Sequence, residues 1–237
     1  NEPLLSSQYM RDGVLRSAVE SLKYALSRVC FSDDALADIQ DALADAECRE
    51  CMTRAYAAER CTRLLLFDDS QAKLFGGNAI PAKIYKWSGV RAHDREIYDS
   101  ALLRLIEISK LPFPEALPKM DKLVEDVTQE IDWKTPFAGM FLLQLQGSIM
   151  NEALLAADIR LANVALAVER YRLAKGAVPE SLSVLVPEYL TEIPEDPFDG
   201  NKLRYNITDT GYTIYSIGPD RTDNNGEPRK GTAGDVV

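Results

Sequence analysis

The chain has 237 residues, enough for one large domain or two modest ones that each bury a core. Hydrophobic residues make up 46% of it and charged residues 27%, which is the ordinary composition of a globular protein. The formal net charge is -10. This charge argues against a nucleic-acid partner and against adsorption onto anionic lipid, because both need concentrated Lys and Arg.

The first half of the sequence has apolar residues at helical spacing. Ser32, followed by Asp33 and Asp34, indicates a helix start, because serine caps free backbone amides and acids complement the helix dipole. A loop is predicted over 70–81, which contains two adjacent glycines and a proline. The helices predicted in chain order are 4–29, 34–43, a cysteine-bearing helix ending near 67–69, 84–110 with a break near 88–89, and 114–132.

The chain has four cysteines, at Cys30, Cys48, Cys51 and Cys61. Cys48 and Cys51 have the C-x-x-C spacing of a redox pair or of half a zinc site. Their surroundings disfavour both, because Asp41–Leu66 has no proline or glycine and predicts continuous helix through the motif. We expect free thiols, with a disulfide or a metal site as the alternatives.

A long helix is predicted from Phe137 to Lys175, a stretch without proline. Thr135-Pro136 precedes it as an N-cap and first-turn proline, and Gly176 follows it as a C-cap glycine. Its apolar residues draw one stripe, formed by Leu154, Ala157, Leu161, Val164, Val168 and Tyr171. The opposite face carries charged residues, namely Glu152, Asp158, Arg160, Glu169 and Arg170.

After Gly176 four prolines interrupt the chain, which leaves room for a helical turn at about 180–185. Leu203–Thr208 and Tyr212–Ile217 alternate apolar and polar residues and predict a β-hairpin, with a third strand beginning at 235–237. The predicted fold class is therefore α+β, mainly α. We expect a helical domain at 1–134, and a long helix with a small antiparallel sheet at 135–237.

Two stretches of this C-terminal part resemble the periplasmic part of the major pseudopilin of type II secretion systems. They are Leu166-Ala-Val-Glu-Arg-Tyr-Arg-Leu-Ala-Lys-Gly-Ala-Val-Pro179 and Leu185-Val-Pro-Glu-Tyr-Leu-Thr-Glu-Ile-Pro-Glu-Asp-Pro-Phe-Asp-Gly200. Tyr205, Gly211-Tyr212, the run from Tyr215 to Asp220 and Gly234-Asp235 complete the pattern. The likeness implies a long helix, an exit loop and a small sheet.

The resemblance also implies a calcium site in the loop after the second hairpin strand. Its candidate ligands in this sequence are the side chains of Asp220, Asp223 and Asp235, with Ile217 or Ser216 offering carbonyls. Six to eight oxygens from a short Asp- and Gly-rich loop suit a hard cation of this kind. The alternative is that the acids and glycines form a solvated turn, since Arg221, Glu227 and Lys230 depart from the family pattern.

The whole chain resembles uncharacterised envelope-associated bacterial proteins. The likeness rests on Glu2-Pro3-Leu4-Leu5, on Ser32-Asp33-Asp34 and on Ala57-Ala58-Glu59-Arg60. It implies an N-terminal membrane helix, a helical domain and then the pseudopilin-like ending. The chain starts at Asn1 without an initiator Met, so we expect an anchoring segment upstream and a location on the periplasmic side of a membrane.

No catalytic constellation emerges from the sequence, and we predict that the chain is not an enzyme. His93 is the only histidine, and Asp94 beside it on a predicted helix points in another direction. The prediction is a non-enzymatic structural or interaction protein of the cell envelope with a protein partner. It contacts membrane only through an upstream segment. The alternatives are a component of a type II secretion or pilus-like assembly, and a ligand-binding or hydrolytic helical domain.

Overall fold

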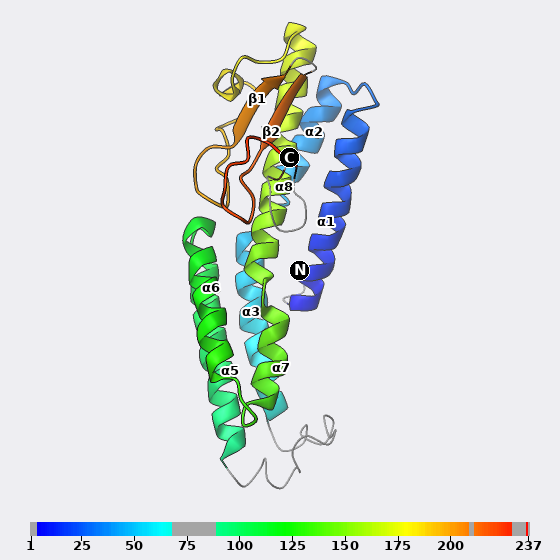
Figure 1. Cartoon of the computed structure of the whole chain (residues 1–237). Coiled ribbons are helices and arrows are strands. Elements are labelled where there is room, and N and C mark those ends of the chain that lie inside the picture. Colours follow the sequence, from blue (N-terminus) through cyan, green and yellow to red (C-terminus); the bar gives the residue numbers. More distant parts are fainter. Residues whose placement is uncertain (1–3, 68–88, 209–210, 229–235, 237) are drawn as a thin grey trace. The chain divides into compact units, whose positions relative to one another are not determined.

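The computed structural model describes residues 4–67, 89–208, 211–228 and 236 (Figure 1). Helix accounts for 65% of the structure and the sheet has two antiparallel strands, which confirms the predicted class, α+β and mainly α. The predicted loop at 70–81, the start of the helix at residue 84 and Asp235 lie outside the described residues. None of the described helices is both long enough and apolar enough to cross a membrane.

The chain divides into two compact units that interleave along the sequence. Unit 1 comprises Asn1–Tyr9 and Arg49–Ile149, and unit 2 comprises Met10–Cys48 and Met150–Val237. Residues from the first fifth of the chain thus share a unit with its C-terminal end. The domain boundary predicted after residue 134 stays a prediction.

Unit 1 is a helical bundle. Its elements are α3 (Arg49–Leu64), η1 (Leu65–Phe67), α5 (Val90–Ser109), α6 (Phe113–Glu130) and α7 (Pro136–Leu145). Tyr98 of α5 is fully buried, and its ring packs against Phe67 and Phe141 at centroid distances of 5.5 and 5.7 Å. Such aromatic contacts contribute beyond area burial, so these three rings help to hold η1, α5 and α7 together.

A buried aspartate caps the start of α7. Thr135 and Pro136 occupy the N-cap and first helical position, as predicted, but Thr135 makes no capping bond from its side chain. Instead Asp94 of α5 accepts from the backbone amides of Phe137 and Ala138, at 3.1 and 2.8 Å. The side chain of Asp94 therefore satisfies two amides that have no partner within the helix, at the positive end of the α7 dipole.

The long helix predicted over 137–175 is wrong in one respect, because it is two helices. α7 ends at Leu145 and α8 (Ser148–Lys175) follows after Gln146 and Gly147. Gly147 has φ of +80°, a left-handed conformation that a non-glycine residue adopts only with strain. Ser148 is buried and accepts a hydrogen bond from Tyr56 at 2.8 Å, which fixes where the second helix begins.

The continuous helix predicted through the C-x-x-C motif is also wrong. In unit 2, α2 (Asp33–Ala44) ends before residue 45, and α3 of unit 1 begins only at Arg49. The predicted N-cap of α2 is confirmed, since the Ser32 side chain accepts from the amide of Ala35. The carbonyl of Ala46, which a continuous helix would pair internally, instead accepts a hydrogen bond from the guanidinium of Arg11. A side chain from a distant segment thus replaces the helical bond.

Unit 2 is built around α8 (Figure 1). Most of α1 (Leu5–Leu26) and all of α2 lie on one side of α8, against Leu155, Ile159, Ala162 and Leu166. The exit loop, η2 (Leu182–Leu185), β1 (Arg204–Thr208) and β2 (Gly211–Tyr215) lie on the other, against Leu161, Val164 and Val168. The helix therefore buries two faces where the sequence pattern predicted one apolar stripe.

The charged face predicted for α8 is paired within unit 2. Arg170 forms an ion pair with Asp33 of α2 at 2.8 Å and donates to Gln40 at 3.1 Å. Gln40 in turn donates to the carbonyl of Tyr189 in the exit loop at 2.8 Å. This chain of contacts connects α2, α8 and the loop, so residues near the N-terminus help to hold the C-terminal module.

The hairpin forms as predicted, with Tyr205 opposite Ile214 and Thr208 opposite Gly211. Ser216 and Val236 exchange both backbone hydrogen bonds at 2.9 Å in an isolated antiparallel bridge. This bridge lies where the sequence predicted the start of a third strand, and it ties the end of the chain to the sheet.

We predict that Asp94→Ala lowers the free energy of unfolding by about 2 kcal/mol, because two amides at the start of α7, one of them buried, lose their acceptor. Asp99→Ala on the same helix is the matched control. It breaks the ion pair with Arg60, in which both side chains are 31% exposed, and should cost less than about 1 kcal/mol. Urea unfolding measures both variants, and equal losses would contradict the capping role.

Candidate functional site

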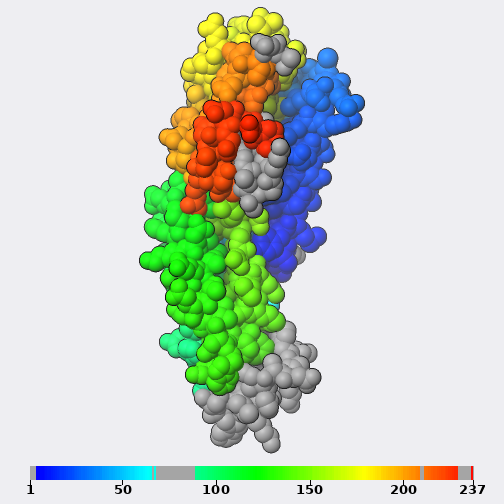
Figure 2. All heavy atoms as spheres, viewed as in Figure 1, coloured from blue at the N-terminus to red at the C-terminus, as the bar shows by residue number. Residues whose placement is uncertain are grey.

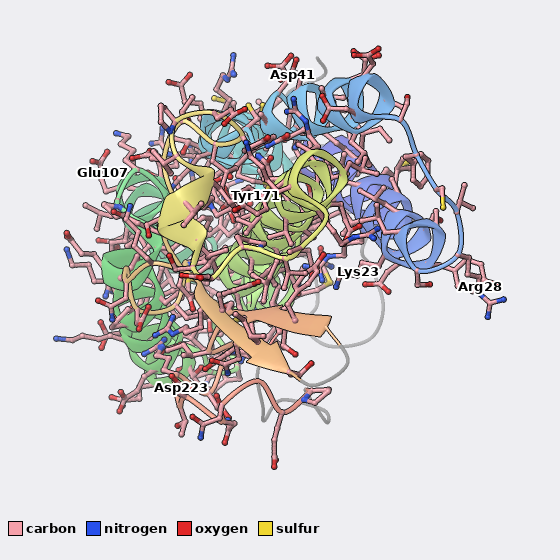
Figure 3. All side chains as sticks on the ribbon, turned by 90° about the horizontal axis from the view of Figure 1, so that it is seen from above. Lys23, Arg28, Asp41, Glu107, Tyr171 and Asp223 are labelled. Carbon is pink, nitrogen blue, oxygen red and sulfur yellow. The ribbon has the colours of Figure 1, made fainter. Side chains whose placement is uncertain are left out.

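The predicted calcium ligands fall in and beside the loop that follows β2. Ile217 is buried, whereas Asp220 and Asp223 are exposed on the loop. Asp235 lies outside the described residues. Figure 2 shows this loop, in red, at the surface of unit 2, and Figure 3 labels Asp223 at its outer edge.

Both described aspartates of this loop accept hydrogen bonds from their own turns. Asp220 accepts from the amide of Thr222 at 3.1 Å, and Asp223 accepts from the amide of Asn225 at 2.9 Å. These are Asx turns, in which a short acidic side chain takes the place of a backbone acceptor two residues before the amide. The loop is therefore shaped in part by the acids that were predicted to bind calcium.

The polar centre of unit 2 is Asp196, just before the hairpin. Its side chain has 0% exposure, and its carboxylate accepts four hydrogen bonds. The donors are the amides of Phe198 and Ile217, the hydroxyl of Ser216 and the guanidinium of Arg204, at 3.0, 2.9, 2.8 and 2.5 Å. Two carboxylate oxygens offer about four acceptor positions, so this group is saturated.

Arg204 is the cation of this centre, which we call the arginine hub: Arg204 with Asp196, Asp199 and Asp223. It binds Asp196 and makes a two-point contact with Asp199. Its Nε also lies 3.7 Å from a carboxylate oxygen of Asp223. Because guanidinium presents a planar fork of donors, one side chain can hold three carboxylates, two from the turn before β1 and one from the loop after β2.

Electrostatics around Asp199 favour its charged form. Burial on its own would raise the pKa of this carboxyl, but hydrogen bonds from Arg204 and Asn201 outweigh it and lower the pKa below the ordinary value. Asp196, Asp199 and Arg204 were not assigned a role from the sequence. The run Asp196-Pro197-Phe198-Asp199-Gly200 carried the turn signal that could have found them.

The arginine hub bears directly on the calcium prediction. Asp223 faces the guanidinium of Arg204, so a dication bound through the same carboxylate would meet a like charge. Within the part of the chain that is described, no cluster of three His, Cys, Asp or Glu side chains is arranged to hold a metal ion. Calcium binding stays a prediction, and it depends on Asp220 and on residues that the structure does not describe.

Two of the four cysteines are free and two form a disulfide. Cys30 and Cys61 are exposed free thiols, as predicted. Cys48 and Cys51 are disulfide-bonded, so the expectation of free thiols is wrong for them and the alternative of a disulfide is right. The reason is the break at 45–48. Cys48 lies just before α3, so its backbone is not held in the helical geometry that the sequence analysis assumed for both cysteines.

Unit 1 contains a small apolar groove along α5, α6 and α7 with a volume of about 30 Å³. Its walls include Leu105, Leu123, Val127, Ile131 and Leu142. Beside it, α7 exposes Met140 by 39% and Leu143 by 60%. Elsewhere in unit 1, His93 is exposed while Asp94 is buried, so these neighbours lie on different faces of α5 as predicted.

Comparisons with known proteins found no match to this chain. No protein-family model matches the chain, and neither the curated proteins nor the solved structures give a significant match. A role for this chain therefore has to come from its own residues and their geometry.

We predict that Arg204→Gln lowers the free energy of unfolding by about 3–5 kcal/mol, because it leaves the buried carboxylate of Asp196 without its cation. Lys202→Gln is the matched control. It removes an exposed pair with Glu195 and should change stability by less than about 0.5 kcal/mol. Chemical denaturation measures both, and similar small effects would show that the hub contributes little.

The lowered pKa of Asp199 predicts that its contribution to stability depends on pH. Its pKa in the folded protein is below that of an ordinary aspartate, so the stability that Asp199 contributes is fully present above the ordinary pKa and is lost as the pH falls through the folded pKa. Asp199→Asn should therefore be less stable than the parent at pH 7, and the difference should shrink below about pH 4. Denaturation curves at a series of pH values measure it, and a constant difference down to pH 3 would contradict the assignment.

Proposed function

We propose that this chain is a non-enzymatic structural and interaction protein of the cell envelope, with a pseudopilin-like C-terminal module and a protein partner. The observation that carries the proposal is the arginine hub. Its buried carboxylate is occupied by two backbone amides, a hydroxyl and a guanidinium. Such an arrangement fixes the turn before β1 to the chain after β2, and a fully occupied carboxylate suits a structural role.

The order of elements in unit 2 supports the pseudopilin-like part of the proposal. α8, the proline-marked loop with η2 and the β1–β2 hairpin follow one another as the sequence resemblance implies. Tyr205 donates to the carbonyl of Pro179 at 2.8 Å, and Tyr212 donates to Glu169 at 3.0 Å. These bonds attach the hairpin to the end of α8 and to its exit loop.

Two further features support the proposed partner and location. The apolar groove of unit 1, with the exposed Met140 and Leu143 beside it, offers a surface on which a partner's helix can bury apolar side chains. The disulfide of Cys48 and Cys51 fits an oxidising compartment such as the periplasm.

Location tests the proposal most directly. The native gene, including whatever precedes Asn1, is expressed with a C-terminal tag, and intact cells and spheroplasts are treated with protease. We expect the chain to sediment with membranes and to be digested in spheroplasts, while a cytosolic marker survives. Recovery of the chain intact with that marker would rule out an envelope location.

Calcium is proposed as a ligand of the loop after β2, and thermal unfolding tests it. If the site forms, calcium at 100 times its Kd adds about 2.7 kcal/mol relative to chelator. Asp220→Asn should remove this gain, whereas Asp38→Asn, an exposed aspartate on α2, should retain it. If the thermal midpoint of the parent is the same with calcium and with chelator, the loop after β2 does not bind calcium.

A further inference from the structure

The disulfide of Cys48 and Cys51 occupies a distinctive place in the fold. The chain has four cysteines, and the other two are free, so the bond joins these two residues. Cys48 immediately precedes α3 (Arg49–Leu64), and Cys51 lies in its first turn. The motif therefore opens a helix of 16 residues.

Once the bond is reduced, the positive end of the helix lies beside both sulfurs. The first amides of a helix have no acceptor within it, and they add to the positive end of the helix dipole. A cysteine at a helix N-terminus is for this reason more readily ionised than one elsewhere. A guanidinium nitrogen of Arg54 lies 3.8 Å from the sulfur of Cys51, and the same nitrogen lies 4.0 Å from the carboxylate of Glu50.

The start of α3 is held in place by Arg49. Its guanidinium stacks on the ring of Phe113 at 3.7 Å and donates to the carbonyl of Leu111. The helix end that supplies the amides is thus anchored to α6. Cys48 and Cys51 are both only partly buried, so a thiol from another molecule can reach the bond.

A purely structural role explains this bond poorly. In the chain-entropy description, a disulfide stabilises a fold by closing a loop, and the gain grows with the number of residues enclosed. Cys48 and Cys51 enclose only two residues, so they constrain the unfolded chain much less than a bond between distant segments would. Reduction should therefore leave the fold nearly as stable as before.

We propose that the Cys48–Cys51 disulfide is a thiol–disulfide exchange site that acts on cysteine thiols. This reactivity is independent of the proposed function. An external thiolate attacks one sulfur, the intramolecular S–S bond breaks, and the second cysteine leaves as thiolate with the electron pair. A second external thiol then attacks the mixed disulfide and releases the oxidised external pair. Two electrons pass to Cys48 and Cys51, which take up two protons, and the reverse sequence reduces an external disulfide while the Cys48–Cys51 bond forms again.

The first test measures equilibrium on the purified chain carrying Cys30→Ser and Cys61→Ser. It is incubated in glutathione buffers of varied ratio, and separately with a synthetic peptide that carries two cysteines, then alkylated and analysed by mass. We expect both redox forms across the series. An effect of the peptide alone points to a protein dithiol, whereas an equal effect of glutathione points to a small thiol. A bond that stays fully oxidised in a large excess of both thiols would overturn the proposal.

The second test compares rates within one chain. In Cys51→Ser and Cys48→Ser, the remaining cysteine of the motif reacts with oxidised glutathione in competition with Cys61, which lies in the last turn of the same helix. At least one of the two should form the mixed disulfide about tenfold faster than Cys61. Rates equal to that of Cys61 in both variants would overturn the proposal.

The third measurement separates reactivity from loss of structure. The thermal midpoint of the reduced parent and of Cys48→Ser/Cys51→Ser should lie close to that of the oxidised parent. A collapse of the midpoint on reduction would assign the bond a structural role and overturn the proposal.

Discussion

The C-terminal half of this protein depends on one buried ion pair, between Asp196 and Arg204. A carboxylate with no exposed surface is tolerated only when its charge is balanced and its oxygens are hydrogen-bonded. Arg204 provides the charge, and the amides of Phe198 and Ile217 provide bonds from opposite ends of the hairpin segment. The loop before β1 and the chain after β2 are therefore fixed to each other, and the hairpin between them has its place on α8.

Unit 1 uses the same physical device at a helix end. Asp94 is buried, and it accepts the two amides with which α7 begins, from a helix more than forty residues earlier. In both units a buried carboxylate joins segments that are distant in sequence. The carboxylate of Asp196 is fully occupied by its four donors, and that of Asp94 holds the start of α7, so both contacts serve the structure.

The candidate groups for ligand binding and for reaction lie away from these two buried carboxylates. The loop after β2 keeps its acids at the surface, where Arg204 already supplies positive charge to Asp223. The C-x-x-C disulfide stands at the start of α3, at the positive end of the helix dipole and beside Arg54. The structural role and the exchange reactivity that we propose are compatible, since a scaffold can carry a redox-active group without being organised around an enzyme's pocket.

The sequence alone determined the local structure that depends on near neighbours: the Ser32 cap, the hairpin from Arg204 to Tyr215 and the class α+β, mainly α. The sequence did not predict the positions at which helices end, where these depend on glycine conformation or on contacts with distant residues. Gly147 interrupts a helix that the periodicity predicted as continuous, and the Ala46 carbonyl, in the break between α2 and α3, accepts a hydrogen bond from Arg11. Asp196, Arg204 and the two buried faces of α8 were likewise decided by tertiary structure. A hydrophobic pattern records that a side chain is buried, whereas the identity of its partner depends on how the chain returns to it in space.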